Sequence, residues 1–158
     1  SQKTALLLQT SCEIGGLCAF ASDKELKCLR DYGYYLGLSF QIRDDILDIL
    51  GKEEEFGKRI GKDIHEGKLG NILVIYALEE LQGGEERRLR KILSKKDINE
   101  SEAEEAIELI RGTEAEARAS ELATGFIQKG EEGLNRLSGN EYMDILRDIL
   151  EFVAKRNI

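Results

Sequence analysis

The sequence of 158 residues contains no proline at all. Proline interrupts helix interiors because it lacks the backbone N–H donor and its ring clashes with the preceding turn. Leu, Ala, Glu, Lys and Arg, which favour helices, make up much of the chain. The sequence therefore predicts an all-α protein that forms a single helical domain over residues 1–158.

Gly, Asn, Asp and Ser interrupt the helical spacing of apolar residues at several points, where they favour caps and turns. Ser22-Asp23 is expected to cap a helix that continues to Leu50, and residues 51–69 form the one long loop. Long loops in compact domains are commonly functional. We therefore divide the domain into site-bearing residues 1–83 and peripheral scaffold residues 84–158. The predicted helices are 2–20, 23–50, 70–81, 85–95, 101–111, 112–137 and 141–156.

The composition excludes two classes of partner. The formal net charge is −8, and a nucleic-acid partner is not expected because phosphate backbones are bound through surplus Lys and Arg. No transmembrane segment is expected, since the longest apolar runs fall well short of the roughly 20 residues that span a bilayer.

Cys12, Cys18 and Cys28 have neither metal-site nor redox spacing, so we expect buried, reduced thiols in a cytoplasmic protein.

Acidic residues cluster near the end of the predicted helix 23–50. Asp44 and Asp48 lie one turn apart on one helix face, with Gln41 a turn earlier. Together with Asp45 they repel one another unless water or a cation neutralises them. Mg²⁺ binds carboxylates, water and substrate phosphate oxygens, so this face is a candidate magnesium site. A solvated acidic helix end is the alternative, and apolar residues between the carboxylates disfavour an EF-hand loop.

The same helical stripe continues backwards through Gly37 and Gly33. A glycine inside a helix costs about 1 kcal/mol relative to alanine, so two in one stripe require a reason. Either the close approach of another backbone or a cavity beside the helix would explain them. The sequence leaves both explanations open.

A basic, glycine-containing segment, residues 57–68, follows the aspartates. Its lysines Lys58, Lys62 and Lys68 stand among glycines that allow tight turns. Lysine ammonium groups beside a metal suit the binding of a diphosphate. A nucleotide P-loop is not expected, because the segment lacks the Gly-x-x-x-x-Gly-Lys-[Ser/Thr] pattern and follows a helix. His65, the only histidine, is expected to be a surface loop residue.

These motifs resemble the second aspartate-rich region of the trans-type polyprenyl diphosphate synthases, which include farnesyl and geranylgeranyl diphosphate synthases. The resemblance is dense over residues 3–79 and only compositional afterwards. The matching residues are Lys3-Thr4-Ala5-x-Leu7, Gly33-x-x-x-Gly37-x-x-Phe40-Gln41-x-x-Asp44-Asp45-x-Leu47-Asp48 and Gly57-Lys58-x-x-Gly61-x-Asp63-x-x-Glu66-Gly67-Lys68.

The resemblance implies the C-terminal portion of the isoprenoid synthase helical bundle, built around a deep cavity. It also implies a magnesium-dependent prenyltransferase that condenses isopentenyl diphosphate with an allylic diphosphate, releases diphosphate and forms a homodimer. The family uses two facing aspartate clusters, whereas this sequence contains one Asp-Asp-x-x-Asp. We therefore expect the chain to be the C-terminal half of such an enzyme and inactive by itself.

The resemblance also assigns roles to individual residues. Asp44 and Asp48 would hold Mg²⁺, with Asp45 and Asp63 as weaker contributors. Lys3, Lys58 and Lys68 would contact the diphosphate. Thr4 and Gln41 would lie beside the reacting carbons and the step of proton loss. Phe40 would flank the homoallylic pocket. The catalytic set implied in this way is Asp44, Asp45, Lys58, Thr4 and Gln41.

The chain departs from the family pattern directly after Lys68. Where the family continues x-Thr-Leu-Pro, this sequence has Leu69-Gly70-Asn71-Ile72. The departure favours a competing hypothesis, a non-catalytic helical interaction or regulatory subunit derived from the same fold. Retention of all three aspartates of the cluster favours descent from an active enzyme.

Overall fold

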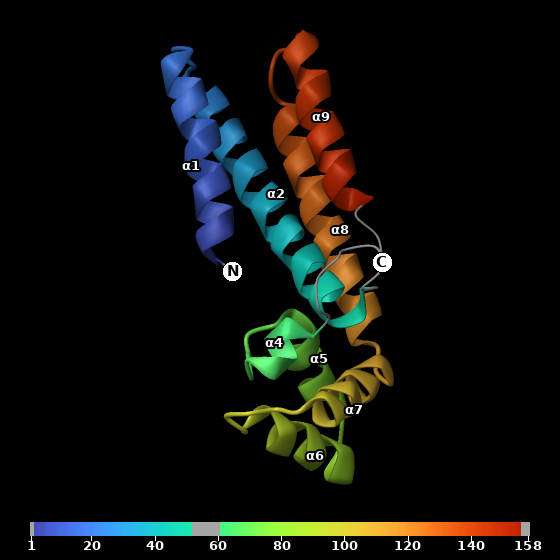
Figure 1. Cartoon of the computed structure of the whole chain (residues 1–158). Helices are drawn as coiled ribbons and strands as arrows, with labels where there is room; N and C mark the ends of the chain where they lie inside the picture. The colour runs from blue at the N-terminus through green and yellow to red at the C-terminus, as the bar shows by residue number, and fades with distance from the viewer. Residues whose placement is uncertain (1, 52–60, 156–158) are drawn as a thin grey trace. The chain divides into compact units, whose positions relative to one another are not determined.

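The structure is a computed structural model that describes residues 2–51 and 61–155 (Figure 1). Within these ranges the regular structure is helical and contains no strand, which confirms the predicted all-α class. In the same ranges no helix is long and apolar enough to cross a membrane. The helices are α1 (Gln2–Cys18), α2 (Asp23–Leu50), α4 (Lys62–His65), α5 (Ile72–Glu80), α6 (Gly83–Leu93), α7 (Glu100–Arg111), α8 (Ala115–Leu134) and α9 (Glu141–Ala154).

The chain divides into two compact units, and the division falls inside α2. The first unit contains the residues up to Arg43 and those from Glu121 onward, and the second contains Asp44–Ser120. The division into site-bearing residues 1–83 and scaffold residues 84–158 is one of role, and it stays a prediction. Within the second unit, α5 packs against both α6 and α7.

Helix α2 begins where the sequence predicts, at a capping box formed by Ser22 and Glu25. The backbone N–H and the hydroxyl of Ser22 both donate to Glu25 Oε2, at 2.8 and 2.6 Å. The Glu25 N–H points back to Ser22 Oγ at 3.4 Å. This reciprocal arrangement satisfies backbone donors that the first turn leaves unpaired. The predicted end of the helix at Leu50 is also confirmed.

In the first unit, α1 packs against α2 at backbone contact, and the two glycines of the stripe make this possible (Figure 1). A Cβ atom on Gly37 would lie 2.5 Å from the Cα atom of Ala5. One on Gly33 would lie 2.6 Å from the carbonyl oxygen of Leu8. The approach of a second helix, and not a cavity, therefore explains the glycine stripe.

Gly37→Ala should destabilise the protein by about 2 kcal/mol, because a methyl group would force the two helices apart. Gly125→Ala is the matched control: Gly125 lies within α8, and a Cβ there would meet no atom within 4 Å. The control should instead stabilise the protein by about 0.5–1 kcal/mol through helix propensity. Chemical denaturation of both variants measures the difference. Equal stabilisation by both would contradict the close approach of α1 and α2.

The core of the first unit lies between α2, α8 and α9. The Tyr32 side chain is 1% exposed, and its hydroxyl donates to the carbonyl oxygen of Leu146 at 3.0 Å. Burial raises the pKa of this phenol, so the hydroxyl remains a donor. Phe40 packs against the edge of the same core. The buried residues of the core are Tyr32, Leu36, Leu134, Met143, Leu150 and Val153.

In the second unit, α7 packs against α4, α5 and α6. Ion pairs reinforce the contact between α6 and α7, with Arg88 bound to Glu105 through two nitrogens. The geometry is bidentate, which is the strongest form of an arginine–carboxylate pair. The buried apolar residues of these helices are Ile64, Leu73, Val74, Ala77, Leu89, Ile92, Leu93, Ala103, Ala106 and Ile110.

Two helices of the first unit expose apolar faces. On each, the exposed residues recur at helical spacing and therefore lie on one side. Contiguous exposed apolar surfaces mark contact sites in soluble proteins. The exposed residues are Leu6, Leu7, Ile14 and Leu17 on α1, and Tyr142, Ile145, Ile149 and Phe152 on α9.

Several local expectations differ from the structure, among them the bounds of α6 (Gly83–Leu93, not 85–95) and α8 (Ala115–Leu134, not 112–137). Helix α1 ends at Cys18 instead of residue 20, because Phe20 adopts a left-handed conformation with φ 55°. Helix α5 begins at Ile72 instead of residue 70, because Asn71 is its N-cap. The prediction of three buried thiols is wrong for Cys18, which is exposed near the end of α1, whereas Cys28 is buried.

Candidate functional site

The three aspartates of the cluster lie in the last two turns of α2, in three different environments. Asp44 is exposed, Asp45 is buried and Asp48 is intermediate. Asp44 and Asp48 are one turn apart, as the sequence predicts. Asp45 lies toward the side of Ile42 and Ile49, which are buried and three and four residues away. The position of Asp45 between these apolar residues is the sequence signal that it is buried, unlike Asp44 and Asp48.

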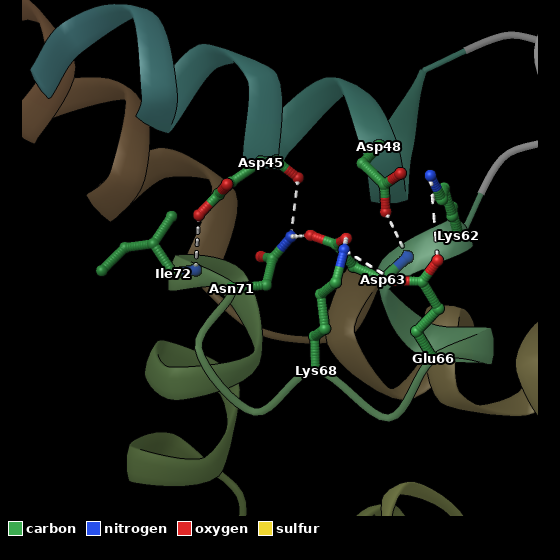
Figure 2. A network of polar contacts seen from close by, with 8 residues as sticks. All are labelled: Asp45, Asp48, Lys62, Asp63, Glu66, Lys68, Asn71 and Ile72. Atoms are coloured by element: carbon green, nitrogen blue, oxygen red, sulfur yellow. Dashed lines mark hydrogen bonds and ion pairs between the residues drawn. The ribbon is translucent and has the colours of Figure 1, made fainter. Parts of the chain in front are cut away.

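Asp48 is tied to the segment that follows the long loop (Figure 2). Its Oδ2 atom accepts a hydrogen bond of 2.9 Å from the backbone N–H of Asp63 at the start of α4. Burial raises the pKa of Asp48, as do the negative charges of Asp63 and Asp44, whereas that hydrogen bond and the positive charge of Lys68 lower it, and the net shift is upward. The negative charge of Asp48 is therefore unfavourable in this environment, and a bound cation would relieve it.

Asp63 is the centre of a polar network on α4 and the turn after it (Figure 2). Its carboxylate accepts hydrogen bonds from Lys68 Nζ at 2.8 Å and from Asn71 Nδ2 at 3.1 Å. Lys68 also pairs with Glu66 Oε2 at 2.7 Å. These two carboxylates raise the pKa of Lys68, with Asp63 the larger cause, so the ammonium group stays charged. Lys62 lies 3.8 Å from Glu66 on the outer side of the network.

Asp45 and Asn71 join the end of α2 to the start of α5. Asp45 Oδ2 accepts a hydrogen bond of 3.1 Å from the backbone N–H of Ile72. The Asn71 amide donates to the carbonyl oxygen of Asp45 at 3.1 Å, and its Oδ1 atom accepts from the N–H of Leu73 at 2.9 Å. Asn71 is 2% exposed. The sequence signal for this residue is an Asn directly before an apolar run, which is typical of an N-cap.

The site residues expected in the first unit are Lys3, Thr4, Phe40 and Gln41. The Thr4 hydroxyl donates to Gln41 Oε1 at 3.3 Å, so the structure brings these two side chains together across α1 and α2. Lys3 is exposed and Phe40 is partly buried. Lys58, the remaining expected diphosphate contact, lies outside the described residues.

His65 is not the surface loop residue that the sequence predicts. It ends the one-turn helix α4, and its side chain is 17% exposed. Its Nδ1 atom lies 3.1 Å from the carbonyl oxygen of Ile98, and Nε2 lies 3.9 Å from Glu100. The short helix was missed because four residues are too few to produce a detectable helical period. The packing of α4 against α7 therefore partly buries this histidine.

The carboxylates suit a hard divalent cation that arrives with other oxygen ligands. Among the described residues, no three His, Cys, Asp or Glu side chains are gathered closely enough to form a metal site by themselves. Mg²⁺ usually takes one or two carboxylates and completes its shell with water and substrate phosphate oxygens. The exposed Asp44 and the partly buried Asp48 fit that requirement better than Asp45, which is buried.

The described helices have the all-α isoprenoid synthase fold. The structure superposes with a TM-score of 0.88 on a decaprenyl diphosphate synthase from Rhodobacter capsulatus, at 31% identity over 98% of this chain and 47% of that chain. A polyprenyl synthase from Caulobacter crescentus, solved with calcium and isoprenyl diphosphate, gives a TM-score of 0.87 at 31% identity, with the same coverage of 98% and 47%.

Sequence comparison leads to the family. The polyprenyl synthetase family model matches residues 1–110. Component 2 of the heptaprenyl diphosphate synthase of Geobacillus stearothermophilus is 36% identical over 99% of this chain and 47% of its own length. The chain belongs to the polyprenyl synthetase family, and it spans about half the length of these relatives.

Proposed function

We propose that the protein to which this chain belongs is a magnesium-dependent polyprenyl diphosphate synthase, a prenyltransferase that joins isopentenyl diphosphate to an allylic diphosphate. The observation that carries the proposal is the pair Asp44 and Asp48, one turn apart on α2 in a chain of this family, with Asp48 held by the Asp63 N–H. The family membership also supports an enzyme over a non-catalytic regulatory subunit.

The reaction breaks the allylic C–O bond, and diphosphate leaves with the electron pair. The alkene of isopentenyl diphosphate attacks the allylic cation, and loss of a proton restores a double bond. Bound Mg²⁺ would neutralise the negative charge that grows on the departing diphosphate. In this chain Asp44 and Asp48 would hold the metal on the helix face, with Asp45 and Asp63 as weaker contributors. Cations placed before the reaction stabilise such charge at little reorganisation cost.

The lysines complete the neutralisation of the diphosphate. Lys3, Lys58 and Lys68 are the proposed contacts, and each presents a compact charge with three N–H donors. Lys68 is bound to Asp63 and Glu66 in the structure, so a diphosphate must share this ammonium group or replace one carboxylate. Diphosphate binding would therefore rearrange the ion pairs of Lys68 with Asp63 and Glu66.

The hydrogen-bonded pair Thr4 and Gln41 is proposed to lie beside the reacting carbons and to take part in proton loss, and Phe40 to flank the homoallylic pocket. We also propose a cytoplasmic homodimer. The Geobacillus relative is named as one component of an enzyme, so a second, different chain is the alternative partner.

An elongation assay tests the proposed function. The full-length protein that contains this chain is incubated with labelled isopentenyl diphosphate and with dimethylallyl, geranyl or farnesyl diphosphate. We expect labelled polyprenyl diphosphate when Mg²⁺ is present and none after chelation. A folded protein that incorporates no label from any of the three allylic substrates would overturn the proposal.

A further inference from the structure

We infer that Asn71 is a positioning residue for the aspartate cluster, a role that rests on the proposed function of that cluster. Asn71 is buried at the junction of α2, α4 and α5, and its side chain forms hydrogen bonds with all three. Figure 2 shows its bonds to Asp45 and Asp63. The amide group offers two donors and one acceptor there. The donors go to the Asp45 carbonyl oxygen and to Asp63 Oδ2, and the acceptor receives the Leu73 N–H.

A continuous series of hydrogen bonds leads from Asn71 to the metal-binding face. Asn71 Nδ2 holds the Asp63 carboxylate at 3.1 Å, and the Asp63 backbone N–H holds the Asp48 carboxylate at 2.9 Å. The orientation of Asp48 therefore depends on the position of Asp63, which Asn71 fixes from the buried side. Residues that orient metal ligands in this way typically change metal affinity about 10–100-fold when they are replaced.

Two groups at the start of α5 anchor it to the end of α2 and to α4. The backbone N–H of Ile72 donates to Asp45 Oδ2 at 3.1 Å, and the Asn71 side chain donates to the Asp45 carbonyl oxygen and to Asp63 Oδ2. A proline at position 72 has no N–H to offer, and a leucine at position 71 can neither donate to Asp63 nor accept from Leu73. The residue types at these two positions therefore determine the junction.

Capping alone does not explain a buried asparagine at this position. Asn99 and Asn140 are the N-caps of α7 and α9, and each accepts a backbone N–H as Asn71 does. Both are exposed. Asn71 differs because it is buried and its amide hydrogens bind the carboxylate of Asp63 and the carbonyl oxygen of Asp45. These two exposed caps provide matched controls for the capping contribution.

The test measures metal binding and stability separately, on the full-length protein that contains this chain. Mn²⁺ binding in the presence of inorganic diphosphate is followed by electron paramagnetic resonance, and unfolding by circular dichroism. Asn71→Asp keeps the N-cap oxygen but removes the donors and places a second negative charge beside Asp63. Asn71→Ser keeps a cap oxygen and removes the amide without adding charge. Asn140→Asp changes an exposed cap in the same way.

We expect Asn71→Asp to weaken Mn²⁺ binding at least about tenfold, Asn71→Ser to weaken it less, and Asn140→Asp to leave it unchanged. Normal Mn²⁺ affinity in folded Asn71→Asp would overturn the inference, even if its unfolding temperature fell. Should that variant not fold, normal affinity in Asn71→Ser overturns it.

The same measurements separate this inference from the proposed function. Loss of binding in Asp44→Ala together with normal binding in both Asn71 variants rejects the positioning role alone. If the wild-type protein does not bind Mn²⁺ with diphosphate, the proposed function fails and the positioning role fails with it.

Discussion

Asp44→Ala should lower the turnover of the full-length protein by about 10³-fold or more, and leave its free energy of unfolding nearly unchanged. Asp44 is exposed on α2, so its replacement removes a metal ligand without opening a cavity in the core. The charge that grows on the departing diphosphate would then lack part of its neutralisation. Steady-state elongation kinetics and chemical denaturation on the same preparation measure the two effects.

Asp45→Ala is the matched comparison for this variant, because the two residues are adjacent but differ in burial. Asp45 is buried and accepts the Ile72 N–H at the start of α5. Its loss should cost about 1–2 kcal/mol of stability, as for other helix-start acceptors, with a smaller decrease in turnover than Asp44→Ala. Near-normal turnover of Asp44→Ala would reject the metal assignment of that carboxylate.

The isolated chain of residues 1–158 should not elongate an allylic diphosphate and should self-associate. It spans about half the length of its relatives and contains one Asp-Asp-x-x-Asp, whereas the proposed reaction requires neutralisation on both sides of the leaving group. The exposed apolar faces of α1 and α9 provide surfaces for association. Weak metal-dependent binding of diphosphate should remain, because Asp44 and Asp48 are present.

Analytical ultracentrifugation, calorimetry and the elongation assay on this chain test the three parts of that expectation. A double substitution on the α9 face, Ile145→Glu with Phe152→Glu, should reduce association because both side chains are exposed. A pair of charge-preserving changes elsewhere on α9, Asp144→Glu with Asp148→Glu, is the control. Elongation by the purified wild-type chain, free of host enzyme, would show that the expectation is wrong.

Much of the fold could be predicted from the sequence, because long helices carry their own signals. The capping box of Ser22 and Glu25 fixes the start of α2, and apolar spacing carries it to Leu50. Short elements gave no such signal. Helix α4 has one turn, and α6 begins at Gly83, a residue that the pattern assigned to the preceding break.

The candidate site could be predicted as a set of residues but not as an arrangement. Helical spacing correctly placed Asp44 and Asp48 on one face of α2. The different environment of Asp45 depends on the backbone of Ile72, which is 27 residues away in the sequence. Likewise, the pairing of Lys68 with Asp63 and Glu66 depends on a turn whose conformation local spacing does not specify. Contacts between distant segments decide these features.

The contact of α1 with Gly33 and Gly37 has a mechanical consequence. Two helices can slide past each other only when their facing side chains can repack. Here the backbone of α1 occupies the space above both glycines, so a shift of one turn would drive a larger group into α2. Helix α1 and the part of α2 up to Arg43 are therefore expected to move as one rigid body. A displacement of Thr4 at the start of α1 would therefore move Gln41 with it. Any conformational change would have to occur elsewhere in the chain.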